Sequence, residues 1–292
     1  MQNLKVNLIE LIRRTSSDLP DDVQKTILTG LKKEAKKSLA EQTLLIIQKN
    51  IELAAKKSQP ICQDTGSILF FVRVPIGFDA LKLEAETRKA VADATSMGYL
   101  RQNSVDSLTG RNSGNNLGPG TPSFHYEFWR KPQVDVRLIL KGGGCENVGA
   151  QYSLPHSGLN ANRDLDGCRR VILDAVVQAQ GKGCGPGVLG VCIGGDRITG
   201  GIHAKEQFLR KLNDRNPNPE LDRLELDITN TANRLGIGPM GFGGTTTLLG
   251  CKIGALNRVP ASYFVTISYM CWAYRRQGFI LNTRGKIEKW LY

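Results

Sequence analysis

Residues 60–75 read PICQDTGSILFFVRVP, and this stretch sets the expected fold class. Its second half, SILFFVRVP, is a short run of apolar, β-branched and aromatic residues that ends at a proline, which is typical of a buried strand. Its first half places a thiol, an amide, a carboxylate and a hydroxyl side by side, at Cys62, Gln63, Asp64 and Thr65. Burying a polar group costs free energy. Four polar side chains shortly before a buried strand therefore indicate a functional segment.

Similar strand-like runs follow along the chain, separated by glycines. They are VDVRLILKGGG (134–144), VLGVCIGG (188–195), TTTLLGCKIGAL (245–256) and YFVTISYM (263–270). Helical patterns fall between them at 166–180 and 220–235, the latter stopped by Gly236. Interleaved strands and helices predict a mixed α/β (α+β) fold.

The N-terminal residues 1–58 have helical periodicity. Asp18 is the expected N-cap of one helix, with Pro20 in its first turn. Ser38 and Glu41 have the spacing of a capping box at the start of another helix. We therefore expect a single domain over 1–292, in which residues 1–58 form a helical cover over a body of mixed β-sheet.

Composition narrows the class of protein. The chain has 292 residues, 40% of them hydrophobic, and no apolar run approaches the ~18–20 residues that span a bilayer. The N-terminus lacks the pattern of a secretory signal, so the seven cysteines are expected to be reduced in the cytoplasm. The net charge of +12 suggests an anionic partner, either nucleic acid or a small acidic substrate. Without an RNA-binding signature or zinc-finger spacing, nucleic acid is disfavoured.

The cysteines differ in their sequence surroundings. Cys168, Cys192 and Cys251 lie in apolar patterns and are expected to be small buried side chains. Cys145, in KGGGCEN, is ambiguous.

The other three, Cys62, Cys184 and Cys271, stand in polar or glycine-rich settings. No two of the seven are spaced C-x-x-C, which argues against zinc ribbons and ferredoxin-type clusters. Three isolated thiolates that converge would suit an iron–sulfur cubane with one open iron. The alternative is seven unrelated cysteines.

Two glycine-rich segments, KGGGCENVG (141–149) and GIGPMGFGGTTTLLG (236–250), lack the order of residues found in nucleotide-binding loops. Their backbone N–H groups could form a nest for carboxylates. Tight turns without a ligand are the alternative.

Five motifs together resemble the α-subunit, or N-terminal half, of class I fumarase and L(+)-tartrate dehydratase. They are CQDTG (62–66), KGGGCEN (141–147), the Cys184 turn with GVLGVCIGG (187–195), LGIGPMGFGGTTTLLG (235–250) and CWAYRR (271–276). They occur in the family's order and extend to about residue 276. CQDTG and the LGIGP-type segment are specific to this family, and CWAYRR is closer to its tartrate dehydratase side.

The resemblance implies a hydro-lyase that adds water to, or removes it from, a short dicarboxylate through a [4Fe–4S] cluster. The family's cluster cysteines fall on Cys62, Cys184 and Cys271. The open iron would bind the hydroxyl and the neighbouring carboxylate of the substrate.

The resemblance also implies substrate contacts. Gln63 and Asp64 match substrate-binding residues, and Asp64 belongs to the family's acid relay. Arg101 matches an arginine that binds a substrate carboxylate, while Gly144 and Asn147 match further contacts. These roles are expectations that follow from the family.

The sequence departs from the family in two respects. The family commonly has a histidine paired with the acid, but the corresponding residue is Val259; His125 is a candidate substitute. The family's remaining substrate-binding residues and catalytic base lie in a C-terminal domain, for which we expect a separate β-subunit.

Two classes of function remain open. The first is the α-subunit of an iron–sulfur hydro-lyase, with fumarate to (S)-malate as the first choice and L(+)-tartrate dehydration as the second. The other is a non-catalytic basic binding protein that kept the fold, for which Val259 is the best argument.

Overall fold

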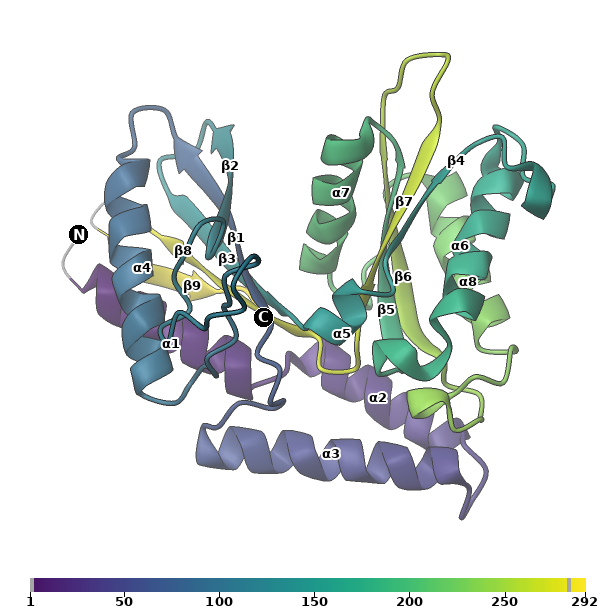
Figure 1. The fold of residues 1–292 in the computed structure, drawn as a ribbon, viewed down its shortest axis with the longest axis horizontal. Coiled ribbons are helices and arrows are strands. Elements are labelled where there is room, and N and C mark those ends of the chain that lie inside the picture. The colour runs from purple at the N-terminus through teal and green to yellow at the C-terminus, as the bar shows by residue number, and fades with distance from the viewer. Residues whose placement is uncertain (1–2, 283–284) are drawn as a thin grey trace. The chain divides into compact units, whose positions relative to one another are not determined.

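The computed structural model describes residues 3–282 and 285–292, and the chain forms two compact units (Figure 1). The first unit comprises Met1–Asp21, Lys49–Gly143 and Arg275–Tyr292. The second unit comprises Asp22–Gln48 and Gly144–Tyr274. Each unit combines segments that are distant in the sequence and contains a sheet of its own, so the mixed α/β fold is confirmed. The prediction of one domain over 1–292 stays a prediction, because compactness alone does not show which part folds independently.

The sheet of the first unit has five strands in the order β2-β1-β3-β8-β9. Their bounds are β1 Ser67–Pro75, β2 Ser123–Trp129, β3 Val134–Lys141, β8 Arg275–Leu281 and β9 Ile287–Trp290. The strand predicted over 67–75 is confirmed with the same bounds. It lies inside the sheet, parallel to β2 and antiparallel to β3, which explains its run of five buried residues from Ile68 to Val72.

Helices α1 (Leu4–Ser17) and α4 (Ala80–Ser96) cover one face of this sheet (Figure 1). Leu8, Leu11 and Ile12 of α1 are fully buried among alternate residues of β1, including Phe70 and Val72. Complete burial of such a side chain stabilises the fold by about 1.5–3 kcal/mol. This core fixes β1 and, with it, the functional segment that precedes the strand.

The sheet of the second unit has the order β4-β7-β5-β6. Its strands are β4 Ala150–Ser153, β5 Gly187–Gly194, β6 Leu248–Leu256 and β7 Phe264–Met270. Helices α6 (Leu165–Ala179) and α8 (Pro219–Ala232) pack on one face, and α7 (Arg197–Glu206) packs on the other (Figure 1). With both faces covered, every residue of β5 is buried.

The remaining helices do not belong to the layers that cover the two sheets described above. They are α2 Asp21–Lys33, α3 Leu39–Lys57, α5 Gly143–Glu146 and the 3-10 helices Ser157–Leu159, Gln180–Gly183, Gln207–Leu209 and Pro239–Gly241. None of the helices within 3–282 and 285–292 combines the length and the hydropathy that crossing a bilayer requires.

The predicted helix starts were right at one position and wrong at the other. Ser38 precedes α3, and its Oγ accepts a hydrogen bond from the Glu41 N–H at 3.1 Å, as predicted. Asp18, by contrast, is the C-cap of α1, because its own N–H donates to the carbonyl of Arg14. The next helix begins only at Asp21, after Pro20, so the prediction of Asp18 as an N-cap was wrong.

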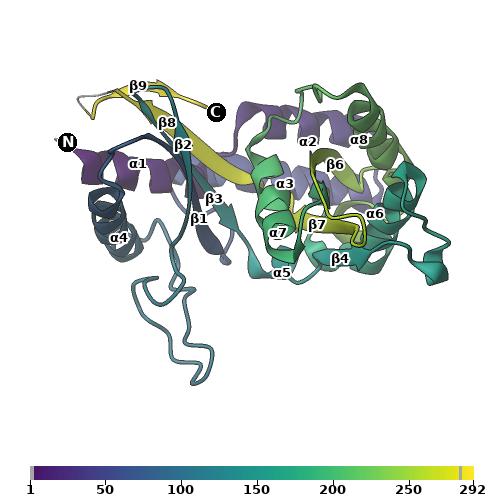
Figure 2. The same cartoon turned by 90° about the horizontal axis from the view of Figure 1, so that it is seen from above.

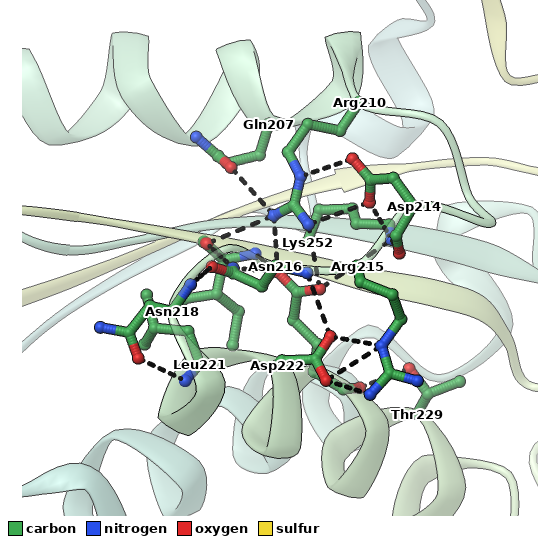
Figure 3. A network of polar contacts seen from close by, with 12 residues as sticks. Gln207, Arg210, Asp214, Arg215, Asn216, Asn218, Leu221, Asp222, Thr229 and Lys252 are labelled. Carbon is green, nitrogen blue, oxygen red and sulfur yellow. Dashed lines mark hydrogen bonds and ion pairs between the residues drawn. The ribbon is translucent and has the colours of Figure 1, made fainter.

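A charged network joins β6 of the second unit to the segment 207–225 (Figure 3). Lys252 Nζ lies 2.6 Å from Asp214 Oδ1, and Arg210 Nη1 lies 2.6 Å from Glu225 Oε1. The side chains of Lys252 and Glu225 are 5% and 6% exposed, so these charges depend on one another for solvation. Burial raises the pKa of Asp214, but hydrogen bonds from Arg210 and Lys252 outweigh it, and the net pKa is lowered.

Candidate active site

The CQDTG segment of the first unit lies between α3 and β1, and Asp64 is at its centre. Asp64 Oδ2 accepts a 2.6 Å hydrogen bond from the N–H of Gly143, and Oδ1 accepts one of 3.1 Å from Asn103 Nδ2. Its backbone carbonyl accepts a 2.8 Å bond from Arg275 Nη1. Residues far apart in the sequence therefore hold this carboxylate in one orientation.

Thr65 joins the same segment to the loop that follows α4. Its Oγ1 accepts from the N–H of Arg101 at 3.2 Å, and the hydroxyl contacts the Arg101 carbonyl oxygen at 3.4 Å. That carbonyl also accepts a 2.7 Å bond from Nδ2 of the buried Asn116. The backbone of Arg101 is thus fixed beside Asp64, while its side chain remains exposed.

A cleft of about 460 Å³ opens at this point of the first unit. Asp64, Asn103, Asn116, Thr121 and Gly143 are among the residues that line it. Its walls are largely amides, hydroxyls and backbone groups, which suits a small polar ligand. The cleft lies within the first unit and contains one of the predicted site residues, Asp64.

Two further clefts contain none of the predicted site residues. One, of about 670 Å³, lies in the second unit at the ends of β5 and β6 and is lined in part by Asn257 and Arg258. The other, of about 680 Å³, lies within the loop 104–119 of the first unit. Both are larger than the cleft at Asp64, but volume alone does not indicate a chemical function.

In the second unit, Cys184 and Cys271 occupy the same edge of the sheet. Cys184 precedes β5, Cys271 directly follows β7, and the antiparallel register pairs Val188 with Met270. The N–H of Trp272 donates to the carbonyl of Cys184 at 3.2 Å, so the two segments are in contact. Cys184 has a left-handed backbone (φ 53°), an unusual conformation for a residue other than glycine.

Tyr269, on β7, supports the Cys184 turn. A Cβ at Gly183 would lie 2.5 Å from Tyr269 Cε1, and one at Gly187 would lie 2.2 Å from Cζ. The turn can therefore follow the tyrosine ring only because these positions are glycine. Burial raises the pKa of Tyr269, and the nearby thiols of Cys271, Cys145 and Cys184 raise it further.

The predicted site residues are divided between the two units. Cys62, Gln63, Asp64 and Arg101 belong to the first unit. Gly144, Asn147, Cys184 and Cys271 belong to the second. Gly144 lies in α5 and Asn147 directly follows it; both are exposed.

A metal-binding group of side chains is not preformed in the parts of the chain that the structure describes. Residues 3–282 and 285–292 contain no group of three or more His, Cys, Asp or Glu side chains arranged to hold a metal ion. The roles of the eight predicted site residues therefore stay predictions.

The remaining cysteines have the predicted burial. Cys168, Cys192 and Cys251 are at most 2% exposed. Burial raises the pKa of the Cys192 thiol to about 12 and also raises those of Cys168 and Cys251. Since metal ligation requires the thiolate, their environments oppose a ligand role. Cys145 is also buried, at 2% exposure.

The two glycine-rich segments bind carboxylates of the chain itself. Gly143, in KGGGCENVG, donates its N–H to Asp64. Thr245, in GIGPMGFGGTTTLLG, donates its N–H to Glu34 Oε2 at 3.0 Å. In both cases a backbone N–H within the segment provides the donor.

Val259, which the resemblance matches to a histidine of the family, is apolar and exposed. Val259 lies between β6 and β7 and is 65% exposed. His125 lies on β2 and stacks on Phe71, with ring centroids 4.9 Å apart, which is a packing contact. Asn103 and Arg275, which both contact Asp64, are not among the predicted site residues, although Arg275 lies in the CWAYRR motif.

Comparison with known proteins adds an independent finding. The family described as Fumarate hydratase (Fumerase) matches residues 6–280. A Geobacillus stearothermophilus protein assigned as a fumarate hydratase class I is 53% identical over 296 residues, covering all of this chain. The chain spans 58% of that relative's length.

Two other relatives are subunits. The L(+)-tartrate dehydratase subunit alpha of Escherichia coli K12 is 31% identical over 91% of this chain and 87% of its own length. A Methanocaldococcus jannaschii protein assigned as the same subunit is 33% identical over 92% of this chain and 94% of its own length.

Proposed function

The chain belongs to the fumarate hydratase (Fumerase) family, and on this premise we propose that it provides the cluster-binding part of an iron–sulfur hydro-lyase. Its reaction is the reversible hydration of a short dicarboxylate, with fumarate to (S)-malate as the first assignment. The 53% identity to a relative assigned as a fumarate hydratase supports this choice. Dehydration of L(+)-tartrate is the alternative, supported by the relatives at 31–33% identity.

The cysteines fit a [4Fe–4S] cluster by their chemistry. Cys62 and Cys184 are partly exposed, and Cys271, at 8% exposure, directly follows β7 beside the Cys184 turn, whereas Cys168, Cys192 and Cys251 are at most 2% exposed. Cys62, Cys184 and Cys271 would hold the cluster, which supplies a Lewis acid for a substrate oxygen when bound.

The residues around Asp64 provide the proton chemistry and part of the substrate binding. We assign Asp64 to proton transfer at its carboxylate oxygens, which Gly143 and Asn103 hold in place. The exposed guanidinium of Arg101 binds a substrate carboxylate by a charge-assisted hydrogen bond. Gln63, Gly144 and Asn147 complete the substrate contacts on this chain.

A second polypeptide supplies the rest of the active site in this proposal. The E. coli and M. jannaschii relatives carry the name subunit alpha, and they are matched over most of their own length. We propose a β-subunit of the C-terminal fumarase type, which contributes further substrate-binding residues and the catalytic base. The surplus of 12 positive charges on this chain attracts a dianionic substrate to the shared cavity. We place the enzyme in the reducing cytoplasm, where cysteine side chains stay as thiols.

The family match over residues 6–280 is the single observation that carries the function. The test is an anaerobic assay of the iron-reconstituted chain, co-expressed and co-purified with a candidate β-subunit of the C-terminal fumarase type. We expect malate from fumarate, with a higher kcat/KM for fumarate than for L(+)-tartrate. An iron-replete complex that turns over neither acid would contradict the proposal and favour a binding protein.

A further inference from the structure

The carboxylate of Asp64 is held by one side chain and one backbone group. Gly143 N–H donates to Oδ2 at 2.6 Å, and Asn103 Nδ2 donates to Oδ1 at 3.1 Å. Two donors on opposite oxygens fix the rotation of the carboxylate about its Cβ–Cγ bond. Each oxygen retains a lone pair for a further hydrogen bond, so the group stays available to a ligand in the cleft.

Asn103 is itself placed by a buried residue. Its backbone N–H donates to Oδ1 of Asn116 at 2.8 Å. Asn116 is 3% exposed, and its Nδ2 donates to Thr95 Oγ1 at 2.9 Å and to the carbonyl of Arg101 at 2.7 Å. The side chain of Asn103 thus projects from a fixed backbone. Asn103 lies in the first part of the long loop between α4 and β2, which extends from the first unit (Figure 2).

Asn103 and Asp64 line the same cleft of about 460 Å³, together with Gly143 and Asn116. A ligand in this cleft therefore meets the carboxylate and the amide that orients it. The amide N–H can orient the carboxylate, but an amide does not act as a general acid or base at neutral pH, so Asn103 acts through Asp64.

We propose that Asn103 is a positioning residue that orients the carboxylate of Asp64. Val259, which stands where the resemblance places the family's histidine, has no hydrogen-bonding group in its side chain. The inference rests on the proposed hydro-lyase function, because it assigns Asn103 to the proton transfer of that reaction.

Three substitutions at Asn103 distinguish a role in orienting Asp64 from a role in packing. Asn103→Asp preserves shape but replaces the donor with an acceptor that repels the neighbouring carboxylate. Asn103→Leu removes the donor without adding charge, and Asn103→Ser keeps a shorter donor. If the amide orients Asp64, kcat falls in the order native, Ser, Leu, Asp, by about 100-fold or more for Asp, while KM changes less than about threefold. If Asn103 only fills space, the isosteric Asp variant is the closest to native.

Asn112→Asp is the matched control. Asn112 lies in the same loop, and its Nδ2 donates to the carbonyl of Gln102 at 2.7 Å without touching Asp64. We expect its kcat and iron content to match the native complex, while its melting temperature is lowered because a carboxylate cannot donate to the Gln102 carbonyl. Loss of iron in Asn103→Asp but not in Asn112→Asp would assign Asn103 to cluster retention and overturn the proposal.

Amide hydrogen exchange of the iron-free chain tests the contact without any turnover. Asn103→Leu should accelerate exchange at Gly143, because a carboxylate free to rotate protects that N–H less well. Asn112→Asp should leave the exchange unchanged. Unchanged protection of Gly143 in Asn103→Leu would overturn the positioning role.

The two proposals fail in different ways. An iron-replete native complex without turnover would overturn the hydro-lyase function, and the assignment of Asn103 with it. Native turnover together with an unchanged kcat for Asn103→Asp would overturn only the assignment of Asn103.

Discussion

Asp64 receives hydrogen bonds from residues 39 and 79 positions away in the sequence, Asn103 and Gly143. Asp64 was noticed in the sequence as one of four polar residues before a strand-like run, and its expected role followed from the family resemblance. The sequence could not identify Asn103 as a partner, because one asparagine in a polar loop resembles its neighbours. Only folding shows which loop residue reaches the carboxylate.

Asp64→Asn tests the catalytic role of this carboxylate. We expect the variant to keep its iron and to lose about 100-fold or more in kcat, because an amide cannot transfer the proton. Iron analysis and initial rates of the complex would measure both effects. Asp93→Asn, at a surface ion pair with Lys5, is the control and should retain full turnover. Near-native turnover of Asp64→Asn would remove Asp64 from the mechanism.

At the scale of elements, the apolar strands were predictable, whereas β2, β4, β8 and β9 were not among the predicted runs. The runs at 67–75, 134–144 and 263–270 correspond to β1, β3 and β7. Strand β8 (Arg275–Leu281) was missed, although Arg275 and Arg276 are at most 1% exposed. Its sequence, RRQGFIL, starts with charged residues that normally lie at the surface. Nothing in this pattern predicts that the backbone carbonyl of Asp64 accepts a hydrogen bond from the guanidinium of Arg275.

The junction between the CQDTG segment and β1 requires glycine. Gly66 has φ +79°, and a Cβ there would lie 2.3 Å from the carbonyl oxygen of Lys141 at the end of β3. Gly66→Ala should therefore displace backbone and lower the free energy of unfolding by about 2–3 kcal/mol or more.

Gly77→Ala provides the matched comparison. Gly77 has a similar φ of +82°, but nothing lies within 4 Å of the added Cβ. The free energy of unfolding of Gly77→Ala should therefore fall only by the conformational strain of the alanine, about 1 kcal/mol. Urea unfolding of both variants would measure the difference; equal losses would show that the contact with Lys141 is not what requires glycine.

At the scale of the whole molecule, the predicted mixed fold is confirmed, but its division into two units could not be anticipated. Each unit is assembled from separate stretches of the chain, and β8 returns to the first unit after the second is complete. The sequence has no linker that would indicate this division into two units. The predicted ligand cysteines likewise belong to different units, Cys62 to the first and Cys184 and Cys271 to the second, so their convergence stays a prediction.

The buried charged network predicts how the second unit responds to substitution and pH. Lys252→Met leaves Asp214 and Glu225 with one cation fewer and should lower the free energy of unfolding by about 3 kcal/mol. Lys36→Met, at the exposed pair with Glu41, should cost less than about 1 kcal/mol. Equal effects in urea unfolding at neutral pH would contradict the role of burial.

The lowered pKa of Asp214 sets the direction of the pH effect. A carboxyl with a lower pKa in the folded state stabilises the protein above its unfolded pKa of about 3.9. That contribution disappears as the pH falls through the folded pKa. Native protein should therefore lose more stability on acidification below about pH 4 than Lys252→Met, measured by urea unfolding across this range.

Iron content in a cysteine series tests the central claim most directly. After anaerobic reconstitution, the native chain should hold about four irons with a broad absorption near ~400 nm, and Cys192→Ser should match it. Cys62→Ser, Cys184→Ser and Cys271→Ser should each lose the cluster, because each removes one thiolate ligand. A native chain without iron, or a series in which Cys192→Ser loses iron and Cys184→Ser keeps it, would contradict this account.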